Sequence, residues 1–124
     1  MLKNKELLIV YELGGYPDFS DLYKSLNYTV QIQRSVRQAI RSIKKSVPAV
    51  IVAEFNFQSD FRDRTSSLES LLSSVQQYDG IDIIVFYEEE YLHQFEKLQK
   101  QYTFTAILPF PIDESSLRKV ISEI

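Results

Sequence analysis

An unbroken apolar run, Pro48-Ala49-Val50-Ile51-Val52-Ala53, ends in Glu54 and Phe55, and Asn56 follows directly. Such a run predicts a strand that is buried on both faces, as in a parallel sheet with helices above and below it. Ligands of open α/β sheets bind beyond the carboxyl ends of such strands. We therefore expect Glu54 to lie where a functional site would form.

Strand-like and helix-like segments alternate along the rest of the chain. Strands are expected at residues 7–11, 29–32, 49–55, 81–87 and 105–108. Helices are expected between them, with Pro17 in the first turn of the first helix and Ser35, Ser66 and Asp113 as N-caps of later ones. Asp79-Gly80 predicts a turn. Five successive β-then-α units predict an α/β fold, a doubly wound five-stranded parallel sheet with helices on both faces.

Size and composition limit the function classes. The 124 residues, 44% of them hydrophobic, fit one domain spanning residues 1–124. The chain has no cysteine, which excludes disulfides, thiolate metal sites and cysteine nucleophiles and fits a cytoplasmic location. A net charge of −3 argues against direct nucleic-acid binding. No apolar run is long enough to predict a membrane span.

Several short patterns, in the right order, resemble the CheY-like receiver domain of two-component response regulators over essentially the whole chain. Residues 7–10 match the strand that precedes an acidic pair in this family, and residues 26–30 match the end of the first helix and the second strand. Residues 48–56 resemble the strand that ends in the phosphoacceptor aspartate, with an Asn two places later. Residues 111–113 with Leu117 resemble the segment that opens the last helix. The resemblance implies a flavodoxin-like sheet with strand order 2-1-3-4-5.

The positions that carry receiver chemistry are substituted. The resemblance places Glu54 where the family has its phosphoacceptor aspartate, and Tyr11 and Glu12 where it has an acidic pair that holds Mg²⁺. Tyr87 falls on the Ser/Thr position, and Phe110, followed by Pro111, falls on the lysine position. Of the family set, Glu12 and Asn56 keep usable chemistry. We therefore expect a degenerate pocket without a catalytic residue.

Three readings of Glu54 follow. In the first reading, Glu54 accepts a phosphoryl group. We do not favour it, because the carboxylate of glutamate lies one methylene further out than that of aspartate, and an error of about 1 Å in position costs roughly a hundredfold in rate. Glu12 and Glu54 are weak candidate ligands for Mg²⁺, and no other cofactor is expected. Glu54 could also mimic a phosphorylated aspartate, but a single carboxylate reproduces only half of that charge. We favour the reading in which Glu54 is a polar strand-end residue that points to water.

A conformational switch is not expected. In the family, a small hydroxyl residue on the fourth strand and an aromatic residue on the fifth move together, whereas here these positions hold Tyr87 and Ile107. The large aromatic residue is thus on the fourth strand instead of the fifth, and the smaller residue is on the fifth. We therefore expect a domain with a single conformational state.

Two other groups of residues invite a functional reading. Arg34, Arg37, Arg41 and Lys44-Lys45 lie on one arc of the expected second helix, and we favour a solvated charged face over a binding surface. The single histidine, His93, has no predicted nucleophile beside it, so we expect no catalytic role.

Protein contact is the function class that these observations favour. In the family, the fourth helix, fifth strand and fifth helix form the common partner and dimer face, to which Tyr91, Tyr102, Phe104 and Leu117 would belong. We expect a non-enzymatic signalling module that dimerises or controls an effector domain, and the chain could be the N-terminal domain of a longer regulator. The alternatives are a receiver that still accepts phosphate or Mg²⁺ in a rearranged site, and a flavodoxin-like domain for an unrelated small ligand.

Overall fold

The structure is a computed structural model in which residues 5–11, 17–55 and 67–124 are described. Glu12, Asn56 and the expected helix cap Ser66 lie outside these ranges. Five strands form one parallel sheet in the order β2-β1-β3-β4-β5, as predicted. The strands are β1 (Glu6–Val10), β2 (Thr29–Gln33), β3 (Val50–Glu54), β4 (Asp82–Tyr87) and β5 (Ala106–Pro109).

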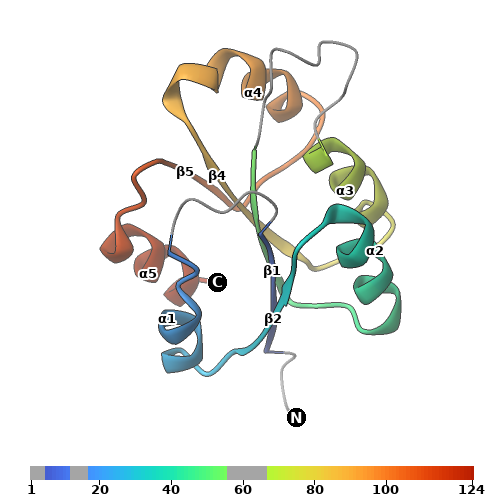
Figure 1. The fold of residues 1–124 in the computed structure, drawn as a ribbon, viewed down its shortest axis with the longest axis vertical. Helices are drawn as coiled ribbons and strands as arrows, with labels where there is room; N and C mark the ends of the chain where they lie inside the picture. The colour runs from blue at the N-terminus through green and yellow to red at the C-terminus, as the bar shows by residue number, and fades with distance from the viewer. Residues whose placement is uncertain (1–4, 12–16, 56–66) are drawn as a thin grey trace.

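Helices cover both faces of the sheet (Figure 1). On one face lie α1 (Ser20–Ser25) and α5 (Glu114–Ser122), and on the other α2 (Val36–Lys45), α3 (Ser67–Val75) and α4 (Leu92–Gln99). A short 3-10 helix, η1 (Glu89–Tyr91), leads into α4. Each face has its own buried cluster of aliphatic and aromatic side chains. The doubly wound α/β architecture is thus confirmed.

Helix ends follow local chemistry. The Ser35 hydroxyl accepts a hydrogen bond from the Gln38 N–H at 3.1 Å, and the Asp113 carboxylate accepts one from the Ser116 N–H at 3.2 Å. Both residues are N-caps, as predicted. The turn at Gly80 is also confirmed, since its φ is 81°. The two caps and this turn could therefore be predicted from the local sequence alone.

The start of the first helix was predicted wrongly. Pro17 precedes α1 rather than lying in its first turn, because Phe19 is the N-cap residue, with a left-handed φ of 54°. The Asp18 carboxylate accepts a hydrogen bond from the Ser20 N–H at 3.0 Å, which forms a local turn before the helix. None of the helices in the described ranges combines the length and the apolarity that crossing a membrane requires.

Candidate functional site

The carboxyl ends of the sheet strands bring together the described residues of the predicted pocket. Glu54 ends β3 and pairs in register with Phe86 of β4, while Tyr87, the last residue of β4, pairs with Pro109. Tyr11 follows β1, and its N–H donates to the carbonyl of Gln33 at 2.9 Å. The predicted pocket residues Tyr11, Glu54, Tyr87, Phe110 and Pro111 therefore all lie at or just beyond this end of the sheet. Glu12 and Asn56 are outside the described residues.

Glu54 does not point to water, which corrects the reading that the sequence favoured. Its exposed fraction is 5%, and it is the single buried charged residue among those that the structure describes. Val52 packs in the cluster under α1 and α5, whereas Ala53 and Phe55 pack in the other cluster. Because side chains alternate along a strand, Glu54 lies on the α1/α5 face of the sheet. Burial of a carboxylate is costly unless polar partners compensate for the lost water.

Aromatic rings line the sheet beside Glu54. Phe86, its register partner, is fully buried on the same face. The ring of Phe19 meets Phe86 edge-on, with centroids 6.2 Å apart, and the ring of Phe110, which directly follows β5, does the same, also at 6.2 Å. An apolar wall of three rings therefore occupies the part of the pocket nearest to β4 and β5.

Phe110 is held by the sheet and by this wall. Its N–H donates to the carbonyl of Tyr87 at 2.8 Å, and its ring packs on the α1/α5 cluster. The peptide bond to Pro111 is cis, and Pro111 is exposed. The position where the resemblance predicts a cation thus carries an uncharged ring that is engaged in core packing.

A cation does reach the other side of the pocket. The Arg34 guanidinium carbon lies 5.1 Å from the centroid of the Tyr11 ring, a cation–π contact. Arg34 is exposed. Sequence reasoning placed Arg34 on the helix arc and missed this contact, although Arg34 directly follows β2, whose carboxyl end lies at the same sheet edge as that of β1.

Tyr87 belongs to a second aromatic group, on the opposite face of the sheet. Its ring stacks on Phe95 of α4, with centroids 5.4 Å apart and planes 27° apart. Phe95 in turn contacts Phe55 at 5.1 Å and Phe104 at 5.4 Å. Ile107, on β5, is half-buried against the same cluster. Tyr87, predicted at the hydroxyl position, is therefore part of the packing that holds α4 on the sheet.

The predicted partner face is only partly available. Tyr91, Tyr102 and Phe104 are half-buried and pack against the core, and a shallow groove of about 350 Å³ runs past Tyr102 and Phe104 between α4 and β5. Leu117 is 0% exposed and lies in the core under α5, so its assignment to the partner face was wrong. Its helical spacing with Ile121, which is also buried, carried the signal for a core position.

The described residues give little support to a metal-binding or catalytic function. Within residues 5–11, 17–55 and 67–124, no group of three or more His, Asp or Glu side chains lies close enough to hold a metal ion. The side chain of His93, near the start of α4, is 86% exposed, with its Nδ1 3.9 Å from a Glu96 oxygen. The candidate Mg²⁺ ligand Glu12 is outside the described ranges.

Comparison with solved structures identifies the fold as that of receiver domains. The chain superposes on a CheY-like response regulator receiver domain from Methanospirillum hungatei JF-1 with a TM-score of 0.77, 16% identity, and coverage of 98% of this chain and 93% of the other. It superposes on the signal receiver domain of an HD domain-containing protein from Pseudomonas fluorescens Pf-5 with a TM-score of 0.78 and 17% identity, covering 99% and 88%. For an adenylate cyclase structure from Rhodopirellula baltica, the TM-score is 0.75 and the identity 16%, and the match covers 98% of this chain and 87% of the other.

Identity this low supports the shared fold alone. No protein-family model matches the sequence, and a search of curated proteins gives no match. The receiver fold, with its 2-1-3-4-5 strand order, is therefore established by three-dimensional similarity, and the chemistry must be argued from the residues of the pocket.

Proposed function

We propose that this chain is a receiver-like signalling module of the two-component type that acts through protein–protein contacts without aspartyl phosphorylation and without enzymatic activity. The observation that carries the proposal is the aromatic wall of Phe19, Phe86 and Phe110 beside the buried Glu54. This wall occupies the side of the pocket from which a receiver would supply a positive charge to the phosphoryl group.

Phosphoryl transfer depends mainly on positioning and on electrostatic stabilisation of the phosphoryl oxygens. Phe110 offers neither charge nor a hydrogen-bond donor in its side chain, and Tyr11 has replaced one of the carboxylates that would hold Mg²⁺. Arg34 makes a cation–π contact with the Tyr11 ring. These substitutions each remove a different part of the phosphoryl-transfer site, so restoring one of them does not restore the reaction.

The contact surface that we propose is formed by α4, β5 and α5. Support comes from the groove beside Tyr102 and Phe104 and from the half-buried ring of Tyr91 nearby. Two of the structural neighbours are described as an HD domain-containing protein and an adenylate cyclase. By analogy, we infer that this domain either dimerises or controls an effector domain.

The test is mass spectrometry of the intact protein after incubation with acetyl phosphate and Mg²⁺. The proposal predicts no gain of a phosphoryl group, for the wild type and for Glu54→Gln alike. A phosphoryl gain that is absent from Glu54→Gln would overturn the proposal and support a rearranged but active receiver site. Binding of Mg²⁺ in calorimetry that Glu54→Gln abolishes would likewise support this second function.

The contact surface is tested separately, by sedimentation of the protein alone and with effector domains fused to it. Tyr102→Ala is expected to weaken association. Tyr78→Ala is the matched control, because Tyr78 is also a half-buried tyrosine that packs on the same core and does not line the groove beside Phe104, although it shares a second groove with Tyr102. Equal effects of both variants would contradict the assignment of the surface.

A further inference from the structure

Helix α2 carries a row of cations on its exposed side. Residues 34–45 contain five of the 14 Lys and Arg residues of the chain and none of its 17 Asp and Glu residues. Four of the five lie within α2, and all four, which we call the α2 row, are exposed: Arg37, Arg41, Lys44 and Lys45. Because the chain as a whole has a net charge of −3, the row is a local concentration of positive charge on an acidic protein.

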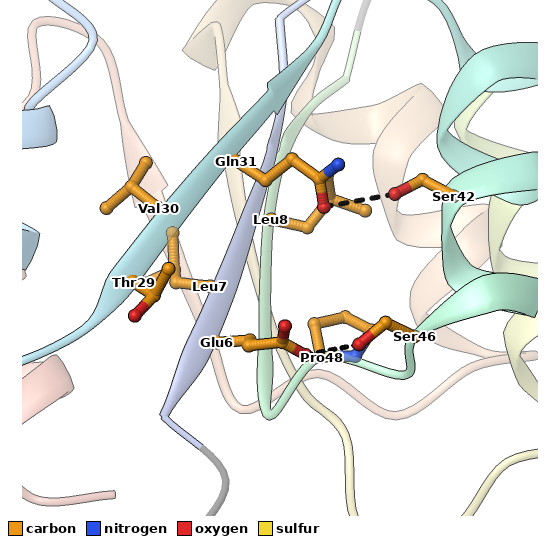
Figure 2. A pocket seen from close by; sticks show the side chains of 9 residues that line it. All are labelled: Glu6, Leu7, Leu8, Thr29, Val30, Gln31, Ser42, Ser46 and Pro48. Atoms are coloured by element: carbon orange, nitrogen blue, oxygen red, sulfur yellow. Dashed lines mark hydrogen bonds between the residues drawn. The ribbon is translucent and has the colours of Figure 1, made fainter.

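The rotation of α2 is fixed by two serines that face the sheet (Figure 2). The Ser42 hydroxyl donates to the Gln31 side-chain oxygen at 3.1 Å. The hydroxyl of the C-cap residue Ser46 donates to the Glu6 carboxylate at 2.6 Å. These four side chains line a groove of about 320 Å³ between α2 and the first two strands. Since successive residues of an α-helix are turned by about 100°, the α2 row lies on the side of the helix that faces away from this groove.

The cations of the row have no acidic partner in the described part of the chain. α2 contains no Asp or Glu. The neighbouring helix α3 contains one acidic residue, Glu69, and no ion pair joins it to the row. A solvated helix face gains stability when opposite charges alternate at i and i+4 positions. The α2 row lacks this arrangement.

Two cations of the row are placed unfavourably for the helix itself. Arg37 and Arg41 are like charges at i and i+4, and such pairs destabilise a helix. Arg37 also lies in the first turn, where the positive end of the helix dipole repels a cation, whereas Lys44 and Lys45 lie in the favourable last turn. Arg37 and Arg41 therefore cost the helix stability without a compensating ion pair. Such a departure from local rules is expected at functional positions.

We propose that the α2 row is a docking site for an acidic α-helix of a partner protein. In such a helix, carboxylates at every fourth position are about 6 Å apart along the axis, which is also the spacing of Arg37, Arg41 and Lys45 along α2. A partner helix lying beside α2 would place its carboxylates against these cations, and complementary charges of this kind speed association and select the partner. The site is separate from the α4/β5/α5 surface and does not depend on the state of Glu54.

An acidic helix fits the row better than a nucleic acid does. From Arg37 to Lys45 the row is about 12 Å long, which matches about two turns of a partner helix. A nucleic-acid duplex would extend past the row over a protein with a net charge of −3, which opposes its approach. α2 also contains no aromatic residue on which a base could stack.

The experiment is an NMR titration of the ¹⁵N-labelled protein with a hydrocarbon-stapled helical peptide that carries three glutamates, at every fourth position, on one face. We expect shifts concentrated in the amides of residues 36–45. Raising the salt from about 0.01 M to about 0.15 M shortens the Debye length from about 30 Å to about 8 Å and should weaken binding. Absence of shifts in these amides at the lower salt would overturn the proposal.

A second stapled peptide of the same composition carries its three glutamates on three different sides of the helix. It should bind about tenfold more weakly than the first peptide, or by about 1.4 kcal/mol, because its carboxylates cannot meet the row together. Equal binding of the two peptides would show a general electrostatic attraction and contradict a docking site for a helix. A DNA duplex that displaces the first peptide from these amides at equal concentration would also contradict it.

Paired variants locate the site on the protein. Arg37→Gln with Arg41→Gln removes half of the row and introduces residues of similar helix propensity. This variant should bind the first peptide about tenfold more weakly than the wild type does. Arg118→Gln with Lys119→Gln removes the same charge from exposed positions of α5 and should leave binding unchanged. Equal losses in the two variants would contradict the assignment to α2.

Urea unfolding of the same variants tests whether the row serves the fold instead. Because Arg37 and Arg41 repel each other, the unfolding midpoint of their double variant should equal or exceed that of the wild type. A lower midpoint would assign these residues to stability and contradict the docking role. The dispersion of each ¹H–¹⁵N spectrum checks folding before titration. These outcomes are independent of the phosphorylation test, since acetyl phosphate is absent.

Discussion

Phe110 and Glu54 together determine what the pocket can do. The ring of Phe110 is part of the hydrophobic packing against Phe86, and the carboxylate of Glu54 is buried on the same sheet face. A lysine at position 110 would have to leave this packing to reach a phosphoryl group. In the proposed correspondence with receivers, Phe110 therefore both lacks the cation and adds to the packing of this sheet face.

Phe110→Lys is expected to destabilise the protein by about 1–3 kcal/mol, because it removes an aromatic contact and half-buried apolar area. The same variant should not acquire a phosphoryl group from acetyl phosphate, because Glu54 and Tyr11 remain. Urea denaturation measures the loss of stability, and intact-protein mass spectrometry measures phosphoryl uptake. Phe110→Leu, which keeps apolar packing, should lose less stability, and phosphoryl uptake by Phe110→Lys alone would refute the account.

Tyr87 fixes α4 through its stack on Phe95. Tyr87→Thr, which introduces the residue type that the resemblance predicts at this position, should cost about 3–5 kcal/mol because it leaves a cavity in an aromatic cluster. Hydrogen exchange should accelerate in α4 more than in α5. Tyr87→Phe, the conservative control, keeps the ring and should stay within about 1 kcal/mol of the wild type.

At the scale of elements, the sequence predicted the strands and two helix caps because these depend on local patterns. The bounds of the five strands agree to within one residue, and Ser35 and Asp113 cap the helices that follow them. Pro17 was misplaced because Asp18 and Phe19 form a turn of their own before α1. The burial of Glu54 could not be predicted, since Phe86, Phe19 and Phe110 reach that side of the sheet from three other parts of the chain.

The cap of α5 makes a pH-dependent contribution to stability. Hydrogen bonds from the Ser116 hydroxyl and N–H lower the pKa of Asp113 below its ordinary value of 3.8. A carboxylate whose pKa is lower in the folded state stabilises the fold above its unfolded pKa, and this contribution is lost as the pH falls through the folded value. Asp113→Asn should therefore flatten the acid limb of the stability curve between about pH 5 and pH 2, measured by urea unfolding. An unchanged acid limb would contradict this role of the cap.

At the scale of the whole molecule, the two faces of the sheet have separate packing. The α1/α5 face holds Glu54 with Phe86 and Phe110, and the opposite face holds Tyr87 with Phe95. In a switching receiver, the strand-four and strand-five residues couple the phosphorylation site to the partner surface. Here the Tyr87 ring of strand four stacks on Phe95, and Ile107 is a half-buried aliphatic residue. We therefore infer a domain with one conformation, whose partners recognise it permanently.

The most direct test of this account is the ¹H–¹⁵N spectrum of the protein recorded with Mg²⁺, before and after addition of beryllofluoride. The account predicts unchanged amide positions for Tyr87, Phe95 and Ile107, because no phosphoryl-like group binds and no second state exists. Saturable shifts of these amides that disappear in Glu54→Gln would contradict it.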